Sequence, residues 1–169
     1  MYTRAIVRRP GRNFASGITT SGLGRPDSGK ALEQHAAYCE ALIKCGVELT
    51  VLDADERYPD GCFVEDTAVV NSKVKVVSRP GATTRRGEEE AIANVLAGYG
   101  PTEAITAPGT MEGGDVLRAE NHYYIGISER TNTEGARQLS DILARHGFTS
   151  SVVPVEAGLH LKSDIAYLG

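Results

Sequence analysis

Three runs that each begin with aspartate recur at a constant interval: DTAVV at 66–70, DVLRA at 115–119 and DIAYL at 164–168. The first aspartate lies 49 residues before the second, and the second lies 49 residues before the third. The first two runs each lead through a turn into a further strand-like segment, at 71–77 and 120–127. Repeat periods of this length are typical of propellers and solenoids. The sequence therefore predicts a repeated strand–strand–helix–strand unit, against the alternative of chance matches in an ordinary α/β chain.

One helix is expected in each repeat, because apolar residues recur there at i, i+3 and i+4. The three segments lie at about 27–45, 85–99 and 133–146, with expected N-caps at Asp27, Thr84, and Asn132 or Thr131. β-Branched runs follow them at 47–52, 102–107 and 149–155, and a first strand is expected within 1–10. The predicted fold class is α/β: an incomplete propeller of about three repeats and the start of a fourth, in a single domain over residues 1–169.

The last repeat carries the stretch GLHLKSDIAYLG at 158–169. Alternation in Leu159-His160-Leu161 and the run DIAYL both predict strand structure. No hairpin partner follows that strand, and natural proteins avoid an open strand edge. We therefore expect self-association, or a further C-terminal segment, to cover this edge.

Composition excludes several classes of partner. The 169 residues carry a net charge of −4, which argues against nucleic acid or an anionic membrane as the main partner. No apolar run is long enough for a transmembrane helix, and no signal peptide is visible. Three cysteines are too few for a disulfide framework, so we expect reduced thiols and a cytoplasmic location. No metal-ligand spacing is present, so we expect no metal.

The densest polar cluster is YPDGCFVEDTAVV at 58–70, which contains Asp60, Glu65 and Asp66. A Glu-Asp pair among apolar residues is costly unless a cation meets it, so this pair favours a site for a planar cation such as a guanidinium. Asp60 taken alone fits a solvated turn equally well. Cys62 lies in the same acidic loop and is a weak candidate for a catalytic thiol.

Four further residues occupy matching places in the repeats. Arg85 and Arg130 each precede a helix, where a cation is electrostatically unfavourable unless it has a function such as clamping a carboxylate. Glu112 precedes the Gly113-Gly114 pair, shortly before Asp115, much as His160 precedes Asp164. Surface arginines, a loop glutamate and a structural histidine are the simpler alternatives. If equivalent loops of a propeller converge, His160, Glu112 and the acidic loop meet around one pocket.

Five segments together resemble one known family: YPDGCFVEDTAVV, SRPGATTRRGE, EGGDVL, YIGISERTNTEGARQL and LHLKSDIAYLG. Their residues and order are similar to dimethylarginine dimethylaminohydrolase, over the whole length of the chain. The resemblance implies the five-unit αβ-propeller of the guanidino-group modifying, or pentein, enzymes. It also implies a hydrolase that acts on a C–N bond of a linear amidine, converting N-omega-methylated arginine to citrulline and methylamine or dimethylamine. The resemblance further implies that the substrate is a small molecule and that the reaction needs no cofactor.

The resemblance implies a role for each candidate residue. His160 is the general acid and base, and Glu112 orients it and binds a substrate nitrogen. Glu65 and Asp66 bind the guanidinium end, and Ser163 is a polar supporting residue. Asp60 and the backbone of Ile18 contact the α-amino group, although the family pattern has leucine where this chain has Ile18. Arg85 and Arg130 hold the α-carboxylate.

The nucleophile is the large departure from the family. Its cysteine lies near the C-terminus of the family's five units, and none of the three cysteines here matches that motif. We therefore expect the chain to correspond to the N-terminal two thirds or so of the enzyme and to be inactive by itself. The alternatives are an arginine deiminase or amidinotransferase, or a non-catalytic arginine-analogue binding module or split-enzyme half.

Overall fold

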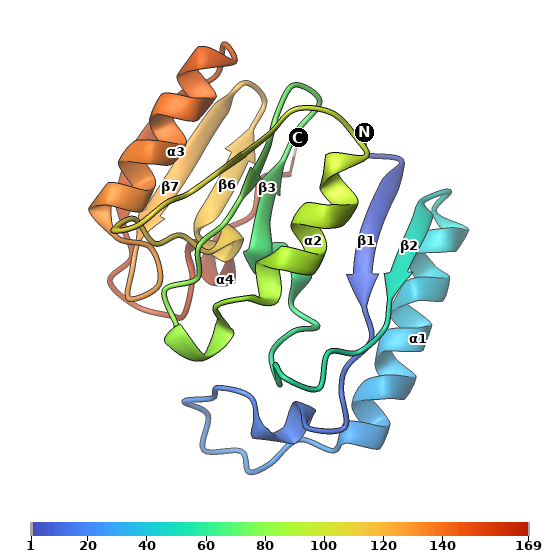
Figure 1. The fold of residues 1–169 in the computed structure, drawn as a ribbon. Coiled ribbons are helices and arrows are strands. Elements are labelled where there is room, and N and C mark those ends of the chain that lie inside the picture. The colour runs from blue at the N-terminus through green and yellow to red at the C-terminus, as the bar shows by residue number, and fades with distance from the viewer. Residues whose placement is uncertain (1, 169) are drawn as a thin grey trace. The chain divides into compact units, whose positions relative to one another are not determined.

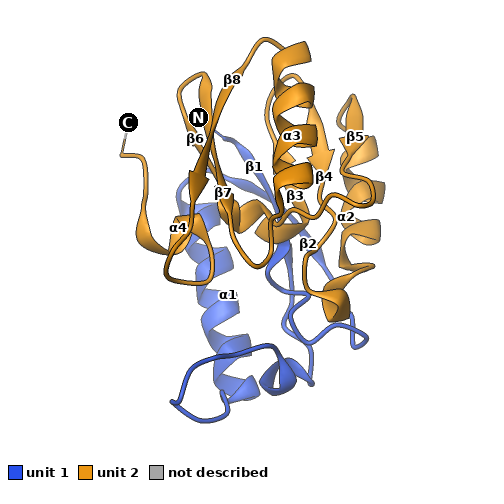
Figure 2. Ribbon diagram, turned by 90° about the vertical axis from the view of Figure 1, so that its left-hand side faces the viewer, with its two compact units in different colours: residues 1–64 blue, residues 65–169 orange. Residues whose placement is uncertain are grey.

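A computed structural model describes residues 2–168 of the chain. Contacts divide the chain into two compact units, Met1–Val64 and Glu65–Gly169, coloured separately in Figure 2. Both units combine strands with helices, so the predicted α/β class is confirmed. Among the described residues, no helix combines the length and apolarity needed to cross a bilayer.

Unit 1 is a β–α–β element. Strands β1 (Arg4–Arg8) and β2 (Glu48–Leu52) pair in parallel, and helix α1 (Ser28–Lys44) connects them and contacts β2 (Figure 1). Asp27 caps α1 as expected, because its side chain accepts the Lys30 N–H at 3.0 Å. Gly46, at φ 82°, turns the chain from the helix into β2. The short 3₁₀ helix η1 (Phe14–Ser16) follows β1.

Unit 2 contains the strand–strand–helix–strand order twice. The first copy is β3 (Ala68–Val70), β4 (Lys75–Val77), α2 (Glu88–Ala97) and β5 (Thr102–Ala104). The second copy is β6 (Val116–Ala119), β7 (His122–Ile127), α3 (Thr133–Arg145) and β8 (Thr149–Pro154). In each copy the first two strands pair antiparallel and the third joins the second in parallel. The predicted repeat is therefore present in the structure of unit 2.

The core of unit 2 lies between its helices and sheets. Helix α3 buries the predicted stripe Ala136, Leu139, Ile142 and Leu143 and contacts β7 and β8. The apolar face of α3 meets side chains from both copies of the repeat. These include Val74, Val76, Met111, Tyr123, Ile125 and Phe148. One continuous core therefore holds the two copies together.

Two boundaries differ from the prediction. Asp66 and Asp115 do not open strands: they lie in the 3₁₀ helices η2 (Val64–Thr67) and η4 (Gly113–Asp115), directly before β3 and β6. Helix α2 begins at Glu88 rather than at Arg85, and Thr84 is not its N-cap. Residues Thr83–Arg85 form a separate 3₁₀ turn, and Gly87, at φ 105°, breaks the helical path between them.

The strand prediction for 159–168 is wrong. His160 is the last residue of a bend at 157–160, Leu161–Asp164 form the short helix α4, and 165–168 are outside any strand. Ile165 has extended dihedral angles, but a strand also needs a hydrogen-bonded neighbour, and none is present among the described residues. Directly after the bend, the Leu161 N–H donates to the Asp115 carboxylate at 3.1 Å, a contact that the alternation of apolar residues does not reveal.

Gly135, in the first turn of α3, lies against a backbone carbonyl. A methyl group there would overlap the Thr110 oxygen, whereas a methyl at Gly29 in the first turn of α1 would meet only the Asp27 side chain, at 3.2 Å. We expect Gly135→Ala to lower the free energy of unfolding by about 1–3 kcal/mol. Gly29→Ala should leave it unchanged or raise it by up to about 1 kcal/mol. Urea unfolding of both variants tests this, and equal stabilities would contradict the close approach.

Candidate active site

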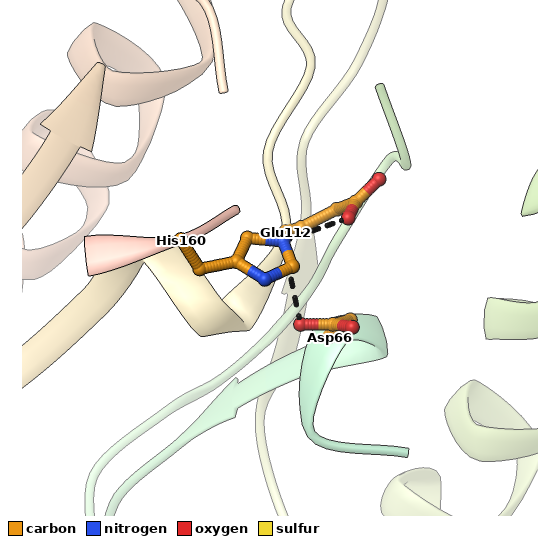
Figure 3. Close-up of side chains that lie close together, drawn as sticks. All are labelled: Asp66, Glu112 and His160. Carbon is orange, nitrogen blue, oxygen red and sulfur yellow. Dashed lines mark hydrogen bonds and ion pairs between the residues drawn. The ribbon is translucent and has the colours of Figure 1, made fainter. Parts of the chain in front are cut away.

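Three side chains from three separate loops of unit 2 converge (Figure 3). His160 Nε2 lies 3.0 Å from Glu112 Oε2 and 3.9 Å from Asp66 Oδ1. Asp66 belongs to η2, Glu112 is the N-cap of η4, and His160 is the N-cap of α4. All three are buried. The sequence prediction that His160, Glu112 and the acidic loop meet is therefore confirmed for Asp66.

The Gly113-Gly114 pair allows this convergence. A Cβ atom at Gly114 would lie 2.6 Å from His160 Cγ and 2.8 Å from Asp66 Oδ1, and one at Gly113 would overlap the carbonyl of Glu65. The absence of side chains at these two glycines therefore permits a close approach of the protein's own loops.

Glu112 is the most thoroughly surrounded of the three. Its Oε1 accepts the backbone N–H groups of Gly81 and Ala82, at 3.1 and 3.3 Å. Arg85 Nη1 lies 3.5 Å from Oε2, and Arg130 Nη1 lies 3.5 Å from Oε1. Burial by itself raises the pKa of Glu112, but the bond from His160 and the charges of the two arginines outweigh it and lower the pKa. Glu112 is therefore held as a carboxylate.

The pKa of His160 is shifted in the opposite direction, upward. Burial lowers the pKa of its imidazole, but the hydrogen bond to Glu112 and the charges of Asp66 and Asp115 outweigh burial and raise the pKa. Nε2 points at Glu112, so the pair resembles an orienting carboxylate and an acid–base imidazole. The raised pKa favours the protonated form of His160 relative to a free imidazole, and the protonated ring can give its proton to a bound group.

Arg85 is buried rather than at the surface. Its Nη1 donates to Asp66 Oδ2 at 2.8 Å, and its Nε and Nη2 donate to Glu88, with Nη2 to Oε2 at 2.8 Å. Burial by itself lowers the pKa of Arg85, but the bonds and charges of Glu88 and Asp66 outweigh burial and raise the pKa. The guanidinium therefore acts within the structure as the counter-ion of three carboxylates: Asp66, Glu88 and Glu112.

The predicted α-amino contacts lie in unit 1. Asp60 is buried, and both of its carboxylate oxygens accept the backbone N–H of Ile18, at 3.1 Å. The adjacent Gly17 leaves room for this bond, because a Cβ there would lie 2.6 Å from Asp60 Oδ1. The structure thus brings together the two residues that the resemblance assigns to one end of the substrate.

Two predicted residues are exposed in unit 2. Glu65 has an exposed side chain and forms an ion pair with Lys162, with Oε1 and Nζ 2.6 Å apart. Glu65 and its neighbour Asp66 thus have different environments, although the sequence suggested one paired site. Ser163, on α4, donates its backbone N–H to the His160 carbonyl at 3.0 Å.

A metal ion fits these residues poorly. Ligand atoms of Asp66, Glu112 and His160 lie within 4.8 Å of one another. Arg85 Nη1 already lies between the two carboxylates, at 2.8 Å from Asp66 and 3.5 Å from Glu112. A divalent cation there would face a fixed positive charge, so the donor set suits a proton and an organic cation better than a metal.

Sequence reasoning missed three buried polar residues that support this group: Glu88, Asp115 and Thr131. Glu88 had no signal, because an acidic residue in the first turn of a helix is ordinary. The 49-residue interval marks Asp115 but predicts only the start of a strand there. The position of Thr131 before a helix predicts only a cap.

Known proteins resemble the chain over nearly all of its length. The family model for N,N-dimethylarginine dimethylhydrolase, eukaryotic, matches residues 26–165. The N(G),N(G)-dimethylarginine dimethylaminohydrolase of Pseudomonas aeruginosa is 49% identical over 99% of the chain and 67% of its own length. The protein of that name from Streptomyces coelicolor is 40% identical over 98% of the chain and 65% of its own length.

A solved structure agrees with these relatives. It shows the Pseudomonas aeruginosa protein, as a cysteine-to-serine variant with citrulline bound. It superposes with a TM-score of 0.97 at 50% identity and covers 99% of this chain and 67% of its own. The chain thus spans about two thirds of the length of these relatives. In sequence and in fold, the chain belongs to the dimethylarginine dimethylaminohydrolase family.

Proposed function

We propose that the chain carries the acid–base and substrate-binding part of an enzyme that hydrolyses N-omega-methylated arginine to citrulline. The observation that carries the proposal is the buried His160–Glu112 pair beside the Asp66 carboxylate. A carboxylate next to a raised-pKa imidazole suits a cationic substrate that must lose an amine. The relatives named for this activity, and the citrulline in one of their structures, support the same substrate class.

In the proposed reaction a cysteine thiolate bonds to the guanidinium carbon. The C–N bond to dimethylamine or methylamine breaks, and protonated His160 gives its proton to the leaving amine. Neutral His160 then takes a proton from water as the water oxygen bonds to the same carbon. The C–S bond breaks and the hydroxyl proton of the intermediate passes to solvent, which releases citrulline and restores the thiolate. Glu112 keeps the imidazole oriented in both steps.

The substrate contacts follow from the same proposal. Asp66 and Glu65 bind the guanidinium end, with Ser163 as a polar support, and Asp60 with the backbone of Ile18 binds the α-amino group. Arg85 and Arg130 serve the α-carboxylate. Arg130 is the better suited of the two, because the Arg85 guanidinium already bonds to Glu88 and Asp66.

We also propose the finer architecture: a partial pentein propeller in which residues 1–169 belong to one domain. The two matching copies in unit 2 and the fold of the relatives support it. The described segment after α4 forms no strand edge, but its exposed apolar residues Ile165, Tyr167 and Leu168 support the proposal that self-association or a further segment covers it. A cytoplasmic location remains a prediction from the cysteine content.

A second candidate function is arginine-analogue binding without turnover. The observation that favours it is the cysteine set: Cys39, Cys45 and Cys62 do not match the family's nucleophile motif. Within this proposal the residues keep their binding roles and only the chemical step is lost. An arginine deiminase or amidinotransferase remains the alternative enzyme.

The first test measures binding and turnover by the 169-residue chain. We expect calorimetry to detect dimethylarginine binding. We expect no citrulline to form, because none of the three cysteines matches the family's nucleophile. Asp66→Asn should weaken dimethylarginine binding by roughly 30-fold or more, since it removes the buried charge that is proposed to bind the substrate's guanidinium. The control Asp141→Asn alters an exposed carboxylate on α3. Turnover by a mass-verified sample would contradict the missing-nucleophile part, and unaltered binding in Asp66→Asn would contradict the guanidinium site.

The second test concerns the pH dependence of stability. The pKa of His160 is raised above 6.5, so its contribution is complete below pH 6.5 and is lost as pH rises through the raised value. The pKa of Glu112 is lowered below 4.5, so its contribution is present above pH 4.5 and is lost as pH falls through the lowered value. The destabilisation caused by Glu112→Gln and by His160→Gln should therefore be largest between pH 4.5 and pH 6.5. Urea unfolding across the pH range checks this, and a pH-independent difference would refute the ion pair.

The third test separates chemistry from binding, in a catalytically complete protein that contains this segment. We expect His160→Gln to lower kcat by roughly 10²- to 10⁴-fold, the usual contribution of a general acid–base group, with a much smaller change in KM. His122→Gln, on β7, is the matched control and should leave both constants near the original values. Equal losses in kcat and in binding would identify His160 as a structural histidine.

A further inference from the structure

Asp115 has a position that its sequence context does not explain. It is completely buried, yet its carboxylate is hydrogen-bonded to three different donors. Ser128 Oγ and Thr131 Oγ1 each donate to Asp115 Oδ2 at 2.6 Å. The backbone N–H of Leu161 donates to Oδ1 at 3.1 Å. These donors come from the loop that follows β7 and from the start of α4.

Each of these bonds leads to a member of the proposed site. Leu161 directly follows His160, so the bond to its N–H fixes the backbone that carries the imidazole. Thr131 Oγ1, which donates to Asp115, also accepts the backbone N–H of Glu112 at 3.2 Å. One carboxylate therefore holds the backbone of both partners in the His160–Glu112 pair.

The third bond leads to Arg130. Ser128 Oγ accepts the backbone N–H of Arg130 at 2.9 Å and that of Thr131 at 3.2 Å, while its hydroxyl donates to Asp115. The orientation of Ser128 is thus set by Asp115, and Ser128 in turn orders the loop that presents Arg130. Removal of the carboxylate would leave the buried Thr131 hydroxyl, and the part-buried Ser128 hydroxyl and Leu161 amide, without this acceptor.

The repeat relation between Asp66 and Asp115 supports a specific structural role for Asp115. Asp66, 49 residues earlier, accepts the backbone N–H of Gly114 at 3.0 Å, as Asp115 accepts that of Leu161. Each aspartate therefore bonds to the loop one repeat further along the chain. Asp164, the third aspartate of the series, is exposed. The first two differ in their surroundings, because Asp66 faces the Arg85 guanidinium and Asp115 is surrounded by hydroxyl and amide donors.

We propose that Asp115 is a positioning residue, which sets the geometry of His160 and Glu112 through Leu161 and Thr131. The catalytic meaning of this role rests on the proposed function, but the geometric role does not. Asp115 does not touch the reacting atoms in this scheme. The charged groups that face His160 are Glu112, Asp66 and Asp115, with Arg85 bonded to the first two.

The test uses ¹⁵N-labelled imidazole signals of the 169-residue chain, in which His35, His122 and His146 serve as internal references. In Asp115→Asn we expect the titration midpoint of His160 to fall toward 6.5 and its signal to broaden, while the signals of the other three histidines are unchanged. Asp164→Asn is the matched control from the same repeat position and should leave His160 unchanged. A folded Asp115→Asn chain with an unaltered His160 would overturn the proposal.

A second variant separates position from charge. Thr131→Val keeps the Asp115 carboxylate but removes the hydroxyl that links it to the backbone of Glu112. We expect the same direction of change at His160, and this variant also serves if Asp115→Asn does not fold. If Asp115→Asn shifts the His160 signal and Thr131→Val does not, the positioning route through Thr131 and Glu112 is refuted.

Failure of the proposed function gives a different result. The imidazole measurement needs neither substrate nor turnover, whereas the proposed function is judged by dimethylarginine binding. A chain that binds no methylated arginine but shows the expected His160 changes would retain the positioning role and lose the function. A chain that binds methylated arginine and shows no His160 change would retain the function and lose the positioning role.

Discussion

Unit 2 is organised by the need to satisfy buried carboxylates. Asp66, Glu88, Glu112 and Asp115 are all inside the protein, where an unpaired charge is very costly. A single guanidinium, Arg85, serves the first three, because its planar fork can donate in several directions at once. Breaking a buried pair of this kind is destabilising, since the remaining charge cannot return to water. The loops that supply these groups are therefore constrained to meet.

The loops can meet only because small residues lie between them. Gly113 and Gly114 let the chain pass against Glu65 and the His160 ring, where any side chain would collide. The 3₁₀ turns η2 and η4 place Asp66 and Asp115 just before their strands and direct both carboxylates into the interior. The site is thus a consequence of turn geometry at the strand starts, supported by a core that both copies of the repeat share.

The same repeat position has acquired different chemical environments. Asp66 faces a guanidinium and an imidazole, Asp115 faces hydroxyls and a backbone amide, and Asp164 is exposed. A constant spacing therefore preserves the fold while the neighbours decide the role of each residue. Arg85 and Arg130 show the same divergence: the first is enclosed by carboxylates, while the second has a long contact with Glu112. Equivalence in sequence does not imply equivalence in chemistry.

The sequence by itself determined the repeated order of strands and helices, because apolar periodicity and helix caps such as Asp27 and Asn132 act over a few residues. It also identified Asp66, Glu112 and His160 as candidates, through the repeat and the family resemblance. The tertiary structure alone decided that Arg85 is buried against Asp66 and Glu112, that Asp115 holds Leu161, and that the segment after His160 is a short helix. These features depend on hydrogen bonds and ion pairs between residues far apart in the chain, and local patterns carry no record of such contacts.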